Sequence, residues 1–339
     1  MSSTPLRAAI IGCGAISKSH ASAITAGEYA TLVALCDVLP QRAEALRDAF
    51  AKDAAVFTDW RKMLDVARPE AVHVCTPHDL HAEMACECLA RGIHVYLEKP
   101  AGNTPEELAA LCRAEAESRA RLTVSFQNRR LPVNRRIYEL IEENGGARAA
   151  RAMVTWHRGI EYYTADDWHG RLAREGGGAM INQAIHTLDL LVSAFPAPPV
   201  SVQGETALWE NAAFSEVEDN AGLLVTFADG GKICFFASND YGGDAQNIYE
   251  VLTKNGARIT CMEGKLFKNG ERVEVETTPA ALVGKSCWGV GHAVAIREFY
   301  EAAATGTEVP VTLTSAARTM RILFALYRSH GEKILLTDE

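Results

Sequence analysis

Apolar and polar residues follow two different patterns along the chain, and the first pattern fills the first third. Short, nearly continuous apolar runs alternate there with amphipathic stretches, as in sheets whose strands are covered on both faces. We expect strands at residues 6–11, 31–36, 71–75, 94–98 and 122–126. We expect helices at residues 15–26, 40–51, 78–91 and 104–119, the last starting with Thr104 as N-cap. This alternation predicts a parallel, doubly wound sheet.

After residue 126 the pattern changes to strands joined by tight turns. The segments RAMVTWHR, LLVTFADGGKICFFAS, NIYEVLTKNGARITCM and KLFKNGERVEVE predict successive antiparallel strands. The turns ADGG, KNGA and KNGE favour hairpins. Further helices are predicted at 177–194, near 290–305 and at 314–330. The fold class is therefore α/β, with an N-terminal Rossmann domain over residues 1–125 and a C-terminal α/β domain with a mostly antiparallel sheet over residues 126–339.

Bulk composition narrows the class of protein without identifying it. At 339 residues the chain is long enough for two domains, and 48% apolar residues supply two cores. The net charge of -9 and the lack of a basic block argue against nucleic acid as a partner. Nine cysteines without a CxxC pair, several of them in apolar runs, predict reduced core thiols. With no leader-like segment and no bilayer-length apolar run, we expect a cytoplasmic protein without a membrane partner.

The first candidate site is the glycine turn GCGA, which follows the first predicted strand and opens a helix. Gly12 permits a tight turn, Gly14 allows close approach of a pyrophosphate, and Ala15 and Ile16 begin the helix. Asp37 ends the second strand, where a carboxylate accepts ribose hydroxyls and repels a 2′-phosphate, which favours NAD over NADP. The alternative is a simple strand–helix joint with a solvated carboxylate, since the third glycine of the fingerprint is replaced by serine.

Polar residues also follow the third and fourth predicted strands, at residues 71–75 and 94–98. Ligands of open parallel sheets bind outside the carboxyl ends of the strands. The residues at that edge are Thr76, Pro77, His78, Glu98 and Lys99. The spacing of His78 and His81 can bind zinc, but no third ligand is evident in the sequence, so we expect no metal.

Several motifs together resemble the Gfo/Idh/MocA family of NAD(P)-dependent oxidoreductases. They are GCGAISKSHASA, CTPHDLH, LEKP, EGGGAMINQAIHTLDLL, GVGHAVAIREFYEA and TLTSAARTMRILFALYRS. The resemblance implies a Rossmann domain followed by a large open-faced sheet, and oxidation or reduction of hydroxyl and carbonyl groups on sugars, cyclitols and sugar nucleotides. It implies Lys99 and His186 as catalytic residues. It places the cofactor among Gly12, Gly14, Asp37, Thr76, Pro77, His81 and Glu98.

One position departs from a frequent family pattern. Four residues before the histidine, many members carry aspartate, whereas this chain carries Asn182. Asparagine can orient a hydroxyl but cannot act as a base. Asn182, His186 and Asp189 are spaced i, i+4 and i+7, which places them on one face of a helix. We expect Asn182 to bind substrate and Asp189 to be structural.

The proton of the reacting alcohol falls to Lys99 and His186. Imidazole titrates near neutrality, and a lysine pKa of about 10.4 should fall beside a cationic nicotinamide. The residue types do not decide which of the two is the base, and we expect the pair to share the task. The alternative interpretations are a hydrogen-bonded core histidine and a surface lysine.

Further polar and aromatic residues suit a carbohydrate site, since sugar faces pack on aromatic rings. SFQNRRLP supplies Gln127, Asn128 and Arg129, and GVGHAVAI supplies His292. Before the last motif helix lie Trp156, His157, Arg158, Tyr162, Tyr163, Trp168 and Arg171. We assign Asn128 and Trp168 to the cofactor, and Arg129, Tyr163 and Arg171 to the substrate. The alternative is that half of these residues serve sheet packing or a subunit contact.

Three functions fit these residues. The first is a reversible NAD-dependent dehydrogenase of a sugar, cyclitol or sugar nucleotide. The second is a glycosidase that oxidises its sugar transiently with tightly held NAD, and the third is an NAD-binding regulator, which has no need of both Lys99 and His186. An open, half-apolar sheet face normally pairs with a copy of itself, so we expect a homodimer or homotetramer.

Overall fold

The computed structural model describes residues 4–244, 247–276 and 290–336, and its contacts divide the chain into two compact units. The first unit comprises Met1–Arg130 and Pro279–Thr314, and the second comprises Leu131–Thr278 and Ser315–Glu339. The sequence placed the whole of residues 126–339 in the second domain. The chain instead returns to the first unit before it completes the second.

The first unit contains a six-stranded parallel sheet, as predicted. Its strands are β1 (Leu6–Ile11), β2 (Ala30–Cys36), β3 (Ala55–Phe57), β4 (Ala71–Val74), β5 (His94–Leu97) and β6 (Leu122–Val124). The spatial order β3-β2-β1-β4-β5-β6 is that of a doubly wound Rossmann sheet. Strand β3, which has only three residues, was not predicted.

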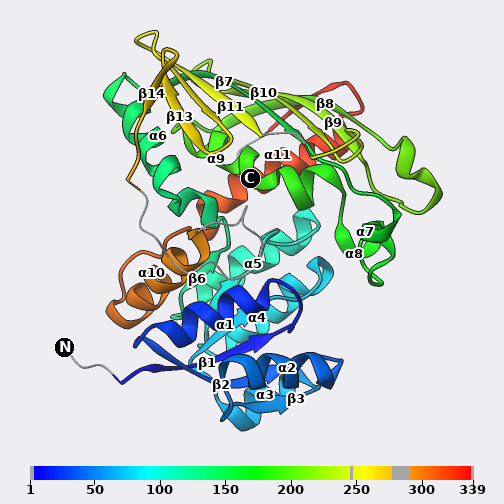
Figure 1. Ribbon diagram of the computed structural model, residues 1–339, viewed down its shortest axis with the longest axis vertical. Coiled ribbons are helices and arrows are strands. Elements are labelled where there is room, and N and C mark those ends of the chain that lie inside the picture. The colour runs from blue at the N-terminus through cyan, green and yellow to red at the C-terminus, as the bar shows by residue number, and fades with distance from the viewer. Residues whose placement is uncertain (1–3, 245–246, 277–289, 337–339) are drawn as a thin grey trace. The chain divides into compact units, whose positions relative to one another are not determined.

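Helices cover this sheet in two layers (Figure 1). They are α1 (Ser17–Ala26), α2 (Pro40–Phe50), α3 (Trp60–Ala67), α4 (His81–Ala90), α5 (Pro105–Glu117) and α10 (Gly291–Thr305), with short 3-10 helices η1 (His78–Leu80) and η2 (Gln127–Arg130). Helix α1 packs against α2 and α10, and α4 packs against α5. The predicted cap is confirmed, since the Thr104 hydroxyl accepts a hydrogen bond from the Glu107 N–H at 3.2 Å. Helix α3 was not predicted.

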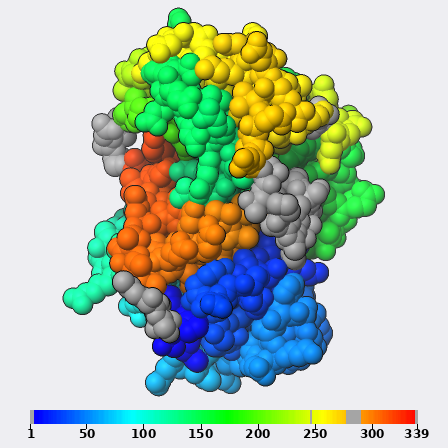
Figure 2. Space-filling view, turned by 60° about the vertical axis from the view of Figure 1, so that its left-hand side comes forward, coloured from blue at the N-terminus to red at the C-terminus, as the bar shows by residue number. Residues whose placement is uncertain are grey.

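Helix α10 explains why the chain returns to the first unit. Its apolar face places Ile296, Phe299 and Tyr300 in the same core as residues of β1, β2 and α1. Figure 2 shows α10 in orange beside the blue surface of the first residues. At the start of α10, a Cβ on Gly291 would lie 2.6 Å from the Gln127 carbonyl oxygen, so the helix and η2 touch backbone to backbone. Periodicity predicts which face of a helix is buried, but not the partner that covers it.

The second unit contains a nine-stranded sheet. Its strands are β7 (Ala147–Thr155), β8 (Pro199–Ala207), β9 (Asn220–Phe227), β10 (Lys232–Ser238), β11 (Ile248–Thr253), β12 (Arg258–Met262), β13 (Lys265–Lys268), β14 (Glu271–Val273) and β15 (Lys333–Leu335). The order is β14-β13-β12-β11-β7-β10-β9-β8-β15. Strands β7 and β10 run parallel and the other neighbours run antiparallel, which confirms the predicted sheet and its three hairpins.

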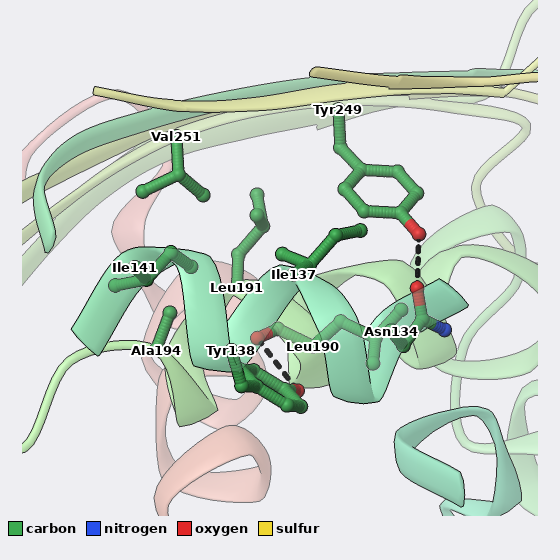
Figure 3. A pocket seen from close by; sticks show the side chains of 9 residues that line it. All are labelled: Asn134, Ile137, Tyr138, Ile141, Leu190, Leu191, Ala194, Tyr249 and Val251. Carbon is green, nitrogen blue, oxygen red and sulfur yellow. Dashed lines mark hydrogen bonds between the residues drawn. The ribbon is translucent and has the colours of Figure 1, made fainter. Parts of the chain in front are cut away.

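One face of this sheet is covered by helices. The helices of the unit are α6 (Pro132–Glu143), α7 (Ile160–Thr164), α8 (Leu172–Glu175), α9 (Ile185–Ser193) and α11 (Leu313–Ser329), with the π-helix η3 (Ala179–Ala184) and the 3-10 helix η4 (Glu210–Ala213). Figure 3 shows α6 and α9 beneath β11, with Ile137, Leu191 and Val251 around a small apolar pocket. The helix predicted at residues 177–194 begins in the structure as the π-helix η3 and continues as α9. Within the described ranges, no helix combines the length and apolar character that crossing a bilayer requires.

Candidate functional site

The glycine turn of the first unit has the shape of a phosphate cradle. Gly12 has a φ of +88°, and a Cβ there would lie 2.5 Å from the Cys75 carbonyl oxygen, so only glycine fits. At Gly14 an added Cβ would meet nothing within 4 Å, which leaves open space in front of α1. In the described structure no side chain caps the first turn of α1. The free helix start and the space at Gly14 fit a pyrophosphate.

Asp37 lies beside this turn, as the sequence predicted. Its carboxylate accepts hydrogen bonds from the backbone N–H groups of Cys13, at 2.8 Å, and Leu39, at 2.9 Å. Each carboxylate oxygen has a second acceptor position, so the group can also accept the ribose hydroxyls of a dinucleotide. The fold thus brings the turn and the acidic residue of the fingerprint into direct contact.

His81 joins the loops that follow β4 and β5. Its two ring nitrogens lie 2.9 Å from the carbonyl oxygens of Thr76 and Pro100, and the side chain is fully buried. Burial lowers the pKa of His81, against the opposing effect of the two carbonyl groups. The residue therefore ties together the loops that carry Thr76 and Lys99.

Glu98 is the anionic end of a buried chain of polar side chains. The chain runs from the Tyr300 hydroxyl to His73 Nε2 at 2.8 Å, from His73 Nδ1 to His20 Nδ1 at 2.8 Å, and from His20 Nε2 to Glu98 Oε1 at 2.9 Å. Burial acts to raise the pKa of the Glu98 carboxyl, but the hydrogen bond from His20 and the nearby His292, whose Nε2 lies 3.6 Å from Glu98 Oε1, outweigh it and hold the pKa well below its usual range.

The hydrogen-bonded side chains from Tyr300 to Glu98 have one consistent arrangement of protons. Burial lowers the pKa of both His20 and His73, so each imidazole is neutral and has one N–H group. Ionised Glu98 accepts from His20 Nε2, which leaves His20 Nδ1 as an acceptor for His73 Nδ1–H. His73 Nε2 then accepts from Tyr300, whose hydroxyl pKa is raised well above its usual value by burial. We call this set, Tyr300, His73, His20 and Glu98, the buried relay. It anchors the residue that precedes Lys99.

His20, Glu98 and His292 also have the composition of a metal site, with one ligand atom from each within 4.8 Å of the others. Around Zn²⁺, with bonds of about 2.0 Å, tetrahedral ligand atoms lie roughly 3.3 Å apart. The distance of 2.9 Å from His20 Nε2 to Glu98 Oε1 is that of a charge-assisted hydrogen bond. The relay explains this spacing without an ion.

The second unit places Asn182 in a polar cluster. The Asn182 amide N–H₂ donates to Glu175 Oε1 at 2.5 Å and to the Tyr162 hydroxyl at 3.0 Å. Tyr162 also accepts from Gln183 Nε2 at 2.8 Å, and the other Glu175 oxygen accepts from the Gly170 N–H at 2.5 Å. Glu175 is buried, with 1% of the residue exposed.

The backbone that leads into η3 packs closely against the backbone at Glu218. At Gly178 a Cβ would lie 2.0 Å from the Glu218 carbonyl oxygen. The buried Glu218 carboxylate accepts from the backbone N–H groups of Gly178 and Met180, at 2.7 and 3.0 Å, and from the Tyr327 hydroxyl at 3.0 Å. It therefore holds the start of the π-helix that carries Asn182.

His186 and Asp189 follow on α9. His186 is half-buried, whereas Asp189 is buried and accepts from the Thr319 hydroxyl at 2.9 Å, which ties α9 to α11. Asp189 is therefore structural, as expected. Lys99, the other predicted catalytic residue, is half-buried in the first unit, directly after Glu98.

The remaining predicted site residues divide between exposed and packed positions. Tyr163 is 4% exposed and packs against Phe214, and Arg171 forms an ion pair with Glu216 at 3.4 Å. The Trp168 ring lies 3.8 Å from that of His169. Half-buried positions hold Thr76, Pro77, Asn128, Arg129 and Trp168, whereas His78 is buried.

Sequence reasoning assigned no role to several residues that the structure brings into these clusters. They are His20, His73, Tyr300, Glu175 and Glu218. The only available signal was a polar residue within an otherwise apolar run, as at His73 in AVHVC. A lone buried histidine has no partner that the sequence can identify.

Comparison with known proteins supports the class that the fold defines. One family model, an oxidoreductase family with an NAD-binding Rossmann fold (GFO_IDH_MocA), matches residues 6–126. A second, the GFO/IDH/MocA C-terminal domain, matches residues 134–261.

Relatives and solved structures extend this similarity over most of the chain. The D-glucoside 3-dehydrogenase of Escherichia coli (strain K12) is 32% identical over 291 residues, which are 80% of this chain and 82% of that protein. The inositol 2-dehydrogenase of Rhizobium meliloti (strain 1021) is 27% identical over 63% of this chain and 62% of its own. The crystal structure of the WlbA dehydrogenase from Bordetella pertussis, in complex with NADH and UDP-GlcNAcA, superposes with a TM-score of 0.84 at 27% identity, covering 99% of this chain and 100% of that one.

A doubly wound sheet whose glycine turn contacts an acidic strand end defines a dinucleotide-binding protein. The chain belongs to the Gfo/Idh/MocA family of oxidoreductases, and its first unit contains the family's NAD-binding Rossmann fold. NAD is therefore its cofactor.

Proposed function

We propose that this protein is an NAD-dependent dehydrogenase or reductase that acts on a secondary alcohol of a sugar, cyclitol or sugar nucleotide. The observation that carries the proposal is the presence, in one chain, of the Gly14–Asp37 cradle and of an amide on η3 and an imidazole on α9, the two helices that follow the glycine motif. The substrates named for the similar dehydrogenases support the same class.

The cofactor is assigned to the carboxyl edge of the parallel sheet. The backbone N–H groups at Gly14, Ala15 and Ile16 would hold the pyrophosphate, and Asp37 would hold the adenosine ribose. When bound, the nicotinamide accepts or returns the hydride. The residues assigned around it are Gly12, Thr76, Pro77, His78, His81, Glu98, Lys99, Asn128 and Trp168.

The proton is assigned to Lys99 and His186. Lys99 can donate to a developing alkoxide or accept its proton, and the imidazole of His186 is a group of the kind that carries such a proton in general acid–base catalysis. Asn182 orients a hydroxyl without ionising. Arg129, Tyr163 and Arg171 complete the proposed substrate contacts.

The second unit supports a homo-oligomer. Along its strands, residues on the face opposite α6 and α9 include the partly exposed apolar side chains Met153, Leu224, Phe236 and Met262. We place a dimer or tetramer contact on this face, and native mass measurement that gives only monomer would refute it. We also place the protein in the cytoplasm, in keeping with free thiols at the eight described cysteines; Cys287 lies outside the described residues.

The test is a screen of sugars, cyclitols and sugar nucleotides that follows the absorbance of reduced cofactor. Lys99→Met and His186→Ala should each lower kcat by about 10²- to 10⁴-fold, the usual contribution of a proton-transfer group, and this loss should far exceed any weakening of NAD binding. Unchanged turnover in both variants would refute the assignment. Cleavage of a glycoside without added NAD and without net reduction would identify the glycosidase instead.

A further inference from the structure

His81 lies between the two loops that follow neighbouring strands of the parallel sheet. Strands β4 and β5 are hydrogen-bonded to each other and run parallel, so Thr76 and Lys99, which follow them, lie at the same edge of the sheet. His81 is the first residue of α4, and its Nε2 lies 2.9 Å from the Thr76 carbonyl oxygen. Its Nδ1 lies 2.9 Å from the Pro100 carbonyl oxygen. A single fully buried ring therefore joins the two loops next to Lys99.

The backbone is held on both sides of Lys99. Before it, the Glu98 N–H donates to the last carbonyl group of β4 at 3.0 Å, and the Glu98 carboxylate accepts from His20 Nε2 at 2.9 Å. After it, the buried Pro100 has a φ that its own ring restricts, and its carbonyl oxygen faces His81. Because proline also restricts the residue that precedes it, a hold on the Pro100 carbonyl group limits the backbone of Lys99.

We propose that His81 is a positioning residue, which holds the Lys99 amine in place through a hydrogen bond from Nδ1–H to the Pro100 carbonyl oxygen. This inference rests on the proposed function, in which Lys99 donates or accepts the proton of the reacting alcohol. A misplacement of about 1 Å at a reacting group can lower the rate about 10²-fold. An anchor beside the residue that carries the amine should therefore affect turnover more than it affects NAD binding.

The two contacts of His81 can be separated by substitution, because a carbonyl oxygen can only accept. A protonated ring donates to both the Pro100 and the Thr76 oxygens, whereas a neutral ring donates to one of them. An asparagine amide places its N–H₂ group where Nδ1 lies, and a glutamine amide places its N–H₂ group where Nε2 lies, since the bonds that lead from Cβ to these nitrogens correspond. His81→Asn therefore keeps the donor to Pro100, and His81→Gln keeps the donor to Thr76.

The first measurement compares kcat, the melting temperature and the Kd for NAD in these two variants. Both lose the packing of the ring, so each is the matched control of the other, and we expect similar melting temperatures and similar Kd values. We expect kcat to fall by about 10²-fold in His81→Gln and to stay within about tenfold of the wild type in His81→Asn. Equal kcat values in the two variants, or a lower value in His81→Asn, would overturn the role of the Pro100 contact.

The second measurement tests whether His81 acts through Lys99. In the double variant Lys99→Met/His81→Gln the amine is already absent, so kcat should equal that of Lys99→Met to within about twofold. Losses that multiply would overturn the positioning role, because His81 would then act on another group.

The third measurement follows Lys99 without turnover, so it separates the positioning role from the proposed function. Reductive methylation with isotope-labelled formaldehyde labels the lysine amines, and the NMR signal that is missing from Lys99→Met identifies Lys99. The chemical shift of this signal should match the wild type in His81→Asn and differ from it in His81→Gln. The same chemical shift in all three proteins would overturn the positioning role. A signal that moves as expected, in a protein for which no sugar, cyclitol or sugar nucleotide reduces NAD, would support the His81 contact and refute the proposed function.

Discussion

Replacing His20 with leucine should destabilise the first unit in a way that depends on pH. Leucine has a similar volume but removes the N–H donor to Glu98, at 2.9 Å, and the acceptor for His73 Nδ1–H, at 2.8 Å. A hydrogen bond to a charged group contributes about 1.5–3 kcal/mol, and a buried donor left unsatisfied costs about 1–3 kcal/mol. We therefore expect a loss of roughly 3–5 kcal/mol at neutral pH, in line with the cost of breaking a buried charged pair.

The pH dependence follows from Glu98. In the wild type its pKa is held well below the usual range, so its stabilising effect is present above the unfolded-state value of 4.5 and is lost as the pH falls through the folded-state pKa. Without His20, His292 still opposes the effect of burial, but the pKa of Glu98 rises from its wild-type value and part of this pH-dependent stability is lost. The difference between the two proteins should widen by about 1.5–3 kcal/mol from acid to neutral pH, the part that belongs to the charged hydrogen bond.

Urea unfolding at about pH 4.5 and about pH 8 measures this difference, with the relevant transition identified by the stabilisation that NAD produces. Tyr300→Phe is the control at the other end of the relay, since it removes a neutral hydroxyl and should cost about 1–3 kcal/mol at either pH. The variant His20→Leu/Glu98→Gln removes the charge and should show no widening. The reasoning is refuted if His20→Leu loses the same stability at both pH values, or if its effect and that of Glu98→Gln simply add.

Three other predictions concern the cradle and the second unit. Gly12→Ala should destabilise the fold by roughly 2 kcal/mol or more, since its Cβ would lie 2.5 Å from a backbone oxygen at a φ of +88°. Gly14→Ala, whose Cβ would meet nothing within 4 Å, should melt like the wild type but bind NAD at least about tenfold more weakly in titration calorimetry. Equal NAD affinity in Gly14→Ala and the wild type would contradict the role of Gly14 in the phosphate cradle. Asp37→Asn should raise the preference for NADP relative to NAD by about tenfold or more, measured as the ratio of Kd values, and an unchanged ratio would reject its ribose role. Burial raises the pKa of Glu218, so the stability that this residue contributes is lost as the pH rises through the raised value. In Glu218→Gln the melting temperature should therefore depend less on pH than in the wild type. An unchanged dependence of the melting temperature on pH would assign the effect to another group.

Local patterns predicted the elements that bury a continuous apolar stretch. The strands at 6–11 and 94–98 were found to within a residue, and the three predicted hairpin turns of the second sheet lie where expected, because side-chain period or turn residues identify them. Strand β3 has only three residues, too few to establish a period. The glycine turn was predictable with its partner Asp37, because both belong to one strand–helix–strand unit.

The polar clusters lay beyond sequence reasoning for a different reason. His73 and Tyr300 are 227 residues apart, and no local signal pairs them. Glu175 and Asn182 are seven residues apart, but a glycine turn and a π-helix lie between them, and α-helical spacing does not predict that contact. Asn182 and His186 were expected on one face of a regular α-helix, whereas the two residues lie on either side of the junction between η3 and α9.

The place of α10 in the core of the first unit has a consequence for biosynthesis. Ile296, Phe299 and Tyr300 emerge from the ribosome about 170 residues after Arg130, the last residue of the unit's N-terminal segment. Until then the apolar side chains that pack against α10 are not covered, and His73 has no hydrogen bond from the Tyr300 hydroxyl. A nascent chain therefore completes its nucleotide-binding half only after the inserted half has been translated. A fragment ending at residue 130 would expose apolar surface and should aggregate rather than bind NAD.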